Sequence, residues 1–508
     1  MNISISFRTA LTMLTLLLFT RVWATEEYSM NYVVEFDTEN HYLNVRLDYT
    51  SDKAPSELTL SMPVWTPGYY EILDFPKHLC DFRVIDRNDN ELEWQKEGKN
   101  HWRIKMSDEG KATITYRIYA NRRDVGSSRV EDSIAFIAPA GVFMNVDGNV
   151  DHPVNVTFIM PEKWNKVATG LKPSGGNSYK FTAPDFDTLY DSPFLIGNFY
   201  TRQFEHEGHI YDFALETPDG VEDMDFEGCF RKIVSATTQL MGDVPYDNYC
   251  LIHMGEGAGG LEHLNSQACY TDGTYRFKSR FQLVKFLAFT AHEYFHLYNV
   301  KCIRPAELWP FDYDKENFTP MLWVSEGLTC YYEFQLLIRA GLATPEEGLD
   351  LLSNYLSRYA PYEGQRHMSL RQSSYDIWLN FMNNDANERD VRVNYYFKGP
   401  VVGLLLDIDI RRRTNNQRSL DDVMRTLYNR FYKELKRGFT EDEFWNMTEE
   451  VAGQPMKEIR RIVDTTVEID YDSYLSFAGL KIGENWRIQK IDNPTPEQKR
   501  FMEAMHLN

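Results

Sequence analysis

The segment His292-Glu293-Tyr294-Phe295-His296 constrains this chain more than any other feature of its sequence. It has the form H-E-x-x-H and lies in an apolar stretch, residues 283–300, whose pattern predicts a helix. Positions i and i+4 share one helix face, so both histidines can reach one metal ion. Glu293 lies beside them, close enough to hold and deprotonate a water molecule. Because so short a pattern also arises by chance, an amphipathic helix with two packed histidines is the alternative.

A second apolar segment, residues 322–337, carries Glu326. Zinc in a hydrolase usually takes three protein ligands and leaves the fourth position open. An unpaired carboxylate would be costly to bury in such an apolar stretch. We therefore expect Glu326 to join His292 and His296 as the third ligand of one Zn²⁺ ion per chain. The alternative is an exposed acid in the first turn of a helix, where the helix dipole favours negative charge.

The residues that follow the histidines carry a resemblance to a known family. HEYFHLYNVKCIRP resembles the glycyl aminopeptidase-like family of gluzincin (H-E-x-x-H … E) zinc metallopeptidases, in which the motif is followed by Asn, Lys and Arg-Pro. The matching residues are Asn299, Lys301, Arg304 and Pro305, while Tyr298 stands where the family often has Trp. WVSEGLTCYYE is similar to the third-ligand segment of related aminopeptidases. MPVWTPGYYEI, GGLEH and YYFKG resemble further segments of the family in the same order, so the resemblance covers most of the chain.

The GGLEH segment is the candidate substrate-binding strand. Gly259 and Gly260 would let a substrate backbone approach closely. The resemblance implies that Glu262 binds the α-ammonium group of the substrate, which would also prevent a longer N-terminal extension. A solvated glutamate in an ordinary glycine turn is the alternative. His263 is a weaker candidate, whose role would be to shape the strand.

The YYFKG segment precedes an apolar helix and supplies a candidate oxyanion donor. The resemblance implies that Tyr396 hydrogen-bonds the developing negative charge, with Tyr395 as the runner-up. An aromatic pair packed at a helix start is the alternative. Three aromatic residues around a Pro-Gly pair, Trp65, Tyr69 and Tyr70, could line the cleft, but such residues are equally typical of a packed turn, and we interpret them as structural.

The order of patterns predicts a multidomain α+β protein. Short alternating segments separated by turn residues run to about residue 200 and favour a β-sandwich. We expect an N-terminal β domain (25–200), a thermolysin-like metallopeptidase domain with a mainly helical C-terminal half (201–465) and a C-terminal tail (466–508). Members of the family often carry a PDZ-like domain as well. The tail is shorter than the roughly 80–100 residues of such a domain, so no full PDZ-like domain is expected.

Residues 1–24 have the pattern of a secretory signal peptide. Arg8 precedes an apolar run, residues 10–19, which is too short to span a bilayer, and Ala24 offers a small residue for cleavage. We expect a secreted or periplasmic protein with no stable membrane insertion after signal cleavage. An uncleaved anchor is the alternative, because Arg21 after the apolar run could stop transfer.

The composition of the chain limits which kinds of molecule it can bind and which kind of scaffold it can form. The formal net charge is −21, which disfavours nucleic-acid binding, because phosphate neutralisation needs clustered Lys and Arg. The six cysteines are irregularly spaced and form no C-x-x-C pair, so the chain is not a disulfide scaffold. The sequence is compatible with one or two disulfide bridges and equally with buried free thiols. The oligomeric state is not specified by the sequence.

These features predict a zinc-dependent peptidase. Its expected substrates are peptides with a free N-terminus, and the resemblance implies release of small N-terminal residues, Gly or Ala. Two alternatives stay open: an endopeptidase on the same scaffold, in which Glu262 does not close the cleft, and a non-catalytic peptide-binding protein. The intact H-E-x-x-H with Glu293 argues against the second, because loss of that base is the simplest route to inactivity.

Overall fold

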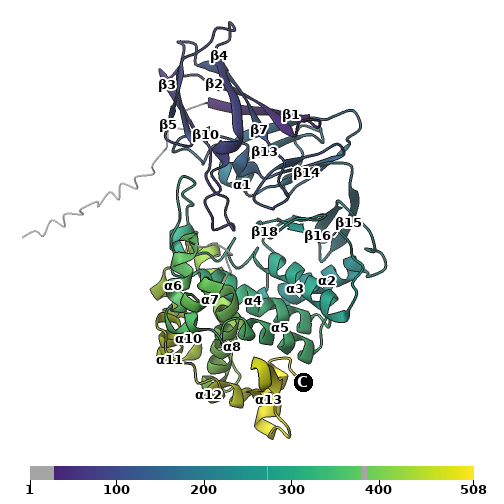
Figure 1. The fold of residues 1–508 in the computed structure, drawn as a ribbon, viewed down its shortest axis with the longest axis vertical. Helices are drawn as coiled ribbons and strands as arrows, with labels where there is room; N and C mark the ends of the chain where they lie inside the picture. Colours follow the sequence, from purple (N-terminus) through teal and green to yellow (C-terminus); the bar gives the residue numbers. More distant parts are fainter. Residues whose placement is uncertain (1–27, 272, 380–385) are drawn as a thin grey trace, which may run out of the picture.

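The computed structural model describes residues 28–271, 273–379 and 386–508, and it has a strand-rich N-terminal domain followed by a mainly helical half (Figure 1). In this view the N-terminal sheets lie at the top, a further sheet lies below them, and the helices lie beneath that sheet. This arrangement is the α+β architecture expected from the sequence. The predicted signal peptide, residues 1–24, lies outside the described residues.

The N-terminal domain consists of three sheets, where the sequence suggested a sandwich. Their strand orders are β13-β11-β1-β2-β7-β4, β10-β3-β6-β5 and β12-β14-β9-β8. The strands and one short helix are β1 (Tyr28–Asp37), β2 (Tyr42–Ser51), β3 (Glu57–Ser61), β4 (Leu79–Ile85), β5 (Trp94–Glu97), β6 (His101–Lys105), β7 (Lys111–Tyr119), β8 (Arg129–Val130), β9 (Ile134–Ile137), β10 (Asn145–Val146), β11 (Val154–Ile159), β12 (Lys166–Ala168), β13 (Lys180–Ala183), α1 (Phe186–Tyr190) and β14 (Phe194–Gly197).

Strand β14 shows why the third sheet exists. Successive side chains of a strand point to opposite faces. Phe194 and Ile196 pack into the core of the N-terminal domain, whereas Leu195 packs into a separate apolar cluster with residues of the next domain, among them Ile252 and Leu261. Because both faces of β14 are buried, its sequence is continuously apolar. The third sheet therefore lies between the core of the N-terminal domain and the next domain.

The second domain begins with a five-stranded sheet of order β15-β16-β17-β19-β18. The pairs β16–β17 and β17–β19 are parallel, and the short edge strand β18 is antiparallel to β19. The predicted boundary after residue 200 falls at the first strand of this sheet. The strands are β15 (Tyr200–His206), β16 (His209–Leu215), β17 (Asn248–Met254), β18 (Gly260–Glu262) and β19 (Ser266–Tyr270).

Helices make up most of the rest of the chain. Helix α3 packs against α4 and also contacts β18, and α4 packs against α8. A π-helical turn, Trp323–Gly327, leads directly into α4. The helices are α2 (Phe226–Met241), α3 (Arg280–Phe295), α4 (Leu328–Arg339), α5 (Pro345–Ser357), α6 (Leu370–Tyr375), α7 (Ala386–Val391), α8 (Tyr395–Arg413), α9 (Leu420–Leu427), α10 (Glu441–Ala452), α11 (Lys457–Asp464), α12 (Asp472–Leu475) and α13 (Pro496–Ala504).

The C-terminal tail is short and packs against this helical half. It contains α12, a hairpin of β20 (Leu480–Ile482) and β21 (Ile488–Lys490), and α13. Strand β21 contacts α5, and Ile488 donates its backbone N–H to Ser353. Within the described ranges, no helix is both long and apolar enough to cross a bilayer. All six cysteines are free thiols, which resolves the choice left open by the sequence.

Candidate metal centre and active site

Three side chains converge at the C-terminal end of α3. His292 lies in the last turn of this helix, His296 is its C-cap, and Glu326 lies in the π-helical turn before α4. The Nε2 atoms of the two histidines are 2.9 Å apart, and Glu326 Oε2 lies 3.2 Å from Nε2 of His296 and 3.7 Å from that of His292. All three side chains are buried.

These distances fit a zinc site. Ligand atoms about 2.0–2.2 Å from a tetrahedral zinc ion lie roughly 3.3 Å from one another, which the observed separations bracket. Two imidazoles and one carboxylate are a common donor set for catalytic zinc. Glu326 is only 2% exposed, so the alternative of a solvated acid at a helix start is wrong. His292, His296 and Glu326 are therefore the residues that would hold the metal.

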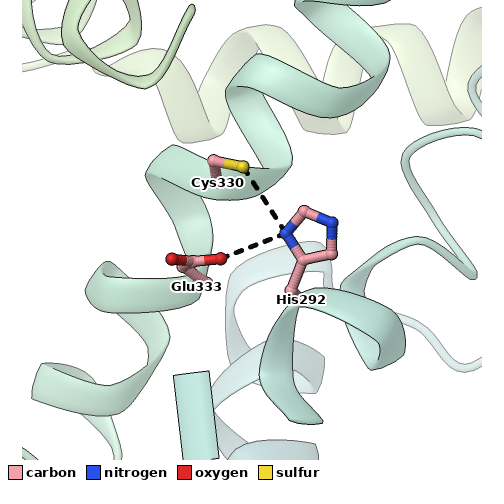
Figure 2. A group of neighbouring side chains, drawn as sticks. All are labelled: His292, Cys330 and Glu333. Carbon is pink, nitrogen blue, oxygen red and sulfur yellow. Dashed lines mark hydrogen bonds and ion pairs between the residues drawn. The ribbon is translucent and has the colours of Figure 1, made fainter. Parts of the chain in front are cut away.

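The remaining nitrogen of each histidine is fixed by a buried partner. Figure 2 shows Nδ1 of His292 facing Glu333 and Cys330, both on α4, at 3.1 and 3.7 Å. Nδ1 of His296 lies 2.7 Å from the backbone carbonyl oxygen of Asn299. Such contacts orient the rings and leave Nε2 free for a metal. Sequence reasoning did not identify Glu333, although it lies on the same helix face as Cys330, about two turns beyond Glu326 and directly after the pair Tyr331-Tyr332.

The His292–Cys330–Glu333 group could itself be considered as a metal site, since its donor atoms lie close together. Both contacts, however, use the same nitrogen of His292 (Figure 2). Burial raises the pKa of Cys330 to about 11, which keeps the thiol protonated at neutral pH. Glu333 also accepts a hydrogen bond from the hydroxyl of Tyr355 at 2.6 Å. We interpret this group as the support of His292.

Glu293 points into the same space. Burial raises the pKa of its carboxyl group to about 7, with the charges of Glu262 and Glu326 adding to the effect and the two histidines opposing it. In the described structure its Oε2 atom has no hydrogen-bond partner. A Cβ atom on Gly260 would lie 2.2 Å from Oε1 of Glu293, so any side chain at this position would displace the carboxylate.

Glu262 ends strand β18 and lies on the other side of the ligand cluster. It is buried, burial raises its pKa, and its Oε1 atom lacks a hydrogen-bond partner within the described chain. Gly68, in the Pro-Gly loop of the N-terminal domain, lies directly against it: an added Cβ would approach both carboxylate oxygens to 2.6 and 2.7 Å. The N-terminal domain therefore closes the cavity beside Glu262. Gly259, by contrast, faces Val125 rather than the carboxylates.

The two candidate tyrosines begin α8. Tyr396 lines the cavity together with the ligands and Glu262, whereas Tyr395 is fully buried. Burial and the charge of Glu326 raise the pKa of Tyr396 well above its ordinary value, so its hydroxyl remains a donor at neutral pH. The geometry therefore favours Tyr396 over Tyr395.

The Pro-Gly loop contributes more than packing. The hydroxyl of Tyr70 donates a hydrogen bond to Oε1 of Glu326 at 3.1 Å, and Tyr69 lines the cavity. Our interpretation of these two tyrosines as structural was wrong, whereas Trp65 is fully buried as expected. Nothing local in the sequence marks Tyr70, because its partner lies 256 positions away.

The residues after the histidines connect the site to its surroundings. The side-chain amide of Asn299 donates to the carbonyl oxygens of Val324 and Ser325 and so fixes the turn that carries Glu326. Lys301 Nζ lies 2.6 Å from Asp191 of the N-terminal domain. His263 contacts the same carboxylate at 3.0 Å, which agrees with the structural role expected for it.

The comparisons with known proteins agree with this geometry. Residues 31–198 match the model of the peptidase M61 N-terminal domain, and residues 285–402 match that of M61 glycyl aminopeptidase. The chain belongs to the M61 glycyl aminopeptidase family. The resemblance found in the sequence is confirmed, and the protein is a zinc-dependent aminopeptidase. The non-catalytic alternative is not supported.

Solved structures show the same architecture. An aminopeptidase N family protein from Idiomarina loihiensis is 27% identical, with a TM-score of 0.84 over 92% of this chain and 82% of that one. An M1 zinc metallopeptidase from Deinococcus radiodurans is 13% identical, with a TM-score of 0.51 over 87% and 94% of the two chains. Aminopeptidase A of Legionella pneumophila, with bound aspartic acid, is also 13% identical, with a TM-score of 0.51 over 87% of this chain and 50% of that one. The last two show the fold alone. Among curated proteins, no match is found.

Proposed function

We propose that this aminopeptidase releases single, small residues from the free N-terminus of peptides, with Glu262 binding the substrate's α-ammonium group. The observation that carries the proposal is the closed end of the cavity, where the buried carboxylate of Glu262 lies against Gly68. A buried carboxylate oxygen that has no hydrogen-bond partner among the described residues favours a cationic ligand. The loop that carries Gly68 lies against Glu262 and would obstruct a longer N-terminal extension. An endopeptidase would need this end of the cavity to be open.

In the proposed mechanism Glu293 is the general base. Bound zinc supplies Lewis acidity, which activates water and polarises the scissile carbonyl. Glu293 accepts a proton from the attacking water and later donates it to the leaving amine, a role that suits a buried carboxyl group next to a metal ligand. Tyr396 donates a hydrogen bond to the carbonyl oxygen as negative charge develops on it. Tyr70 holds Glu326 in position.

The proposal includes a preference for N-terminal Gly or Ala and a location outside the cytoplasm. The family is described as glycyl aminopeptidases, which favours small N-terminal side chains. The pattern of residues 1–24 supports export to the periplasm or the medium. Cleavage would leave a chain without a stable membrane insertion.

The exopeptidase proposal is tested with matched peptides that carry a free or an acetylated N-terminus. Acetylation removes the charge that Glu262 would bind and adds bulk at the closed end. We expect acetylated peptides to be poor substrates. Glu262→Gln should lose roughly tenfold or more of its activity on free peptides, because one charge-assisted hydrogen bond contributes about that factor. Products are identified by mass spectrometry.

The control is Glu71→Gln, which removes an exposed carboxylate from the wall of the same cavity. Its activity on free peptides should stay close to that of the wild type. Equal cleavage of free and acetylated peptides by the wild type, with internal cuts, would support the endopeptidase alternative and contradict the proposal.

A further inference from the structure

The active-site cavity opens into a second cavity on the side away from Glu262. The first has a volume of about 610 Å³ and the second about 800 Å³. They share four lining residues: Phe281, Asn354, Arg358 and Phe397. The two are therefore parts of one cleft, which runs from the N-terminal domain past the metal ligands to helix α5.

The rise per residue of helix α3 gives distances along this cleft. Its residues Lys285, Phe289, His292 and His296 all line the active-site cavity. At a rise of 1.5 Å per residue, Lys285 lies about 10 Å from His292 along the helix axis. An extended peptide advances about 3.3–3.6 Å per residue. A substrate that runs along α3 would bring its second or third residue after the scissile bond beside Lys285.

Two cations line the active-site cavity, Lys285 on α3 and Arg358 at the C-cap of α5. The Arg358 guanidinium lies over the ring of Phe397, 5.0 Å from its centre. In the part of the chain that the structure describes, neither cation forms an ion pair. They stand out because the chain as a whole has a net charge of −21.

The other charged residues that line the cleft nearby are engaged or distant. Glu333 binds His292 and Tyr355, and Asp350 lies 2.7 Å from Arg487. Glu484 is exposed and lines only the outer cavity. The stretch between Phe289 and the shared rim is therefore locally positive. Such a stretch favours an anionic group on the substrate.

We propose that Lys285 and Arg358 bind a carboxylate of the peptide substrate, two or three residues beyond the scissile bond. This inference rests on the proposed aminopeptidase direction, with the ammonium group at Glu262. The free C-terminus of a tripeptide or tetrapeptide has the right chemistry at the right distance. An acidic side chain at the same position would offer the same group. The enzyme would thus select short peptides by both ends.

The test compares three peptides with the zinc-loaded enzyme: Ala-Ala-Ala-Ala with a free C-terminus, the same peptide as its C-terminal amide, and Ala-Ala-Ala-Asp amide. We expect kcat/KM to be about fivefold or more higher for the free acid than for the amide, mainly through KM, and the difference to shrink at high salt. Recovery with the Asp peptide would show that the site accepts any carboxylate. Its failure would restrict the site to the C-terminus. Equal kcat/KM for free acid and amide would overturn the proposal.

Variants connect the preference to the two cations. Arg358→Gln and Lys285→Gln should each lower the ratio of free-acid to amide kcat/KM, and the double variant should bring it close to one. Both sites are exposed, so neither change threatens the fold. Arg366→Gln, an exposed arginine paired with Glu363 outside both cavities, should keep the wild-type ratio. An unchanged ratio in the double variant would also overturn the assignment.

A binding measurement separates this inference from the proposed function. Glu293→Gln keeps the three metal ligands but lacks the base, so peptide binding can be followed by calorimetry without turnover. Tighter binding of the free acid than of the amide supports the carboxylate site, whatever bond is cut. N-terminal release from both peptides at equal rates, with equal binding, would leave the aminopeptidase intact and reject the carboxylate site.

Discussion

At the scale of single residues, the adjacent tyrosines of α8 differ in what they can do. Tyr396 lines the cavity and Tyr395 is fully buried. We expect Tyr396→Phe to lower kcat by about 10²–10³-fold with little change in KM, because an oxyanion hydrogen bond forms mainly in the transition state. Steady-state kinetics with a free alanyl peptide measures both constants. Tyr395→Phe is the control, and a larger defect in that variant would transfer the role to Tyr395.

A side chain at Gly68 should disturb the active site by steric contact with Glu262. It has φ of +88°, and a Cβ atom there would meet the carboxylate of Glu262 at 2.6 Å. We expect Gly68→Ala to lose most activity on free peptides, because either the loop or Glu262 must move. Gly98 also has a positive φ, +66°, but nothing lies within 4 Å of its added Cβ. Gly98→Ala should carry a similar backbone strain of roughly 1–2 kcal/mol and keep its activity, as peptide assays would show.

At the scale of elements, two glycines set the distance between the π-helical turn and α8. A Cβ on Gly399 would lie 2.6 Å from Cα of Gly327, and the reverse distance is 2.7 Å. This close approach brings the start of α8, with Tyr396, beside the turn that carries Glu326. The sequence shows both glycines but gives no reason for them, since each lies inside a helical segment, where glycine is unfavourable.

We therefore expect Gly399→Ala to push α8 away from Glu326 and to weaken metal binding together with activity. Zinc content after dialysis against a chelator measures the first effect, and peptide hydrolysis the second. Gly403→Ala, one turn further along α8, would meet side chains of Leu328 and Tyr331 at 3.0 and 3.1 Å, which can adjust. Its loss should be smaller. An equal loss in both variants would mean that the helix simply tolerates no added methyl group.

At the scale of the whole molecule, the sequence predicts contacts between residues that are close in the chain. It does not predict contacts between residues that are far apart in the chain. His292 and His296 were predicted because a helix brings positions four apart together. Glu326 was predicted because a carboxylate in an apolar segment needs a partner. Tyr70 and Gly68 act on the site from the other domain, and no local periodicity encodes such contacts. The third sheet of the N-terminal domain was missed for the same reason, since β14 reads only as a buried strand.

The contact between the domains is itself built around one buried carboxylate. Asp191, at the C-cap of α1, receives Lys301 at 2.6 Å, His263 at 3.0 Å and the backbone N–H of Leu264 at 2.9 Å. Burial opposes ionisation of Asp191, but Lys301 and His263 outweigh it and hold its pKa well below the ordinary value. A carboxyl group with a depressed pKa stabilises the fold above the ordinary pKa, and its contribution is lost as the pH falls through the folded-state value.

Asp191→Asn should therefore destabilise the protein strongly at neutral pH. Lys301 is only 4% exposed, and removal of one partner of a buried ion pair costs about 3–5 kcal/mol, because the remaining charge stays buried without compensation. The midpoint of urea unfolding measures the effect. A second Asp–Lys pair between the domains, Asp247 and Lys172, is exposed, so Asp247→Asn should leave the midpoint unchanged. If the two variants unfolded at the same urea concentration, Asp191 would not be what holds the Pro-Gly loop's domain over the active site.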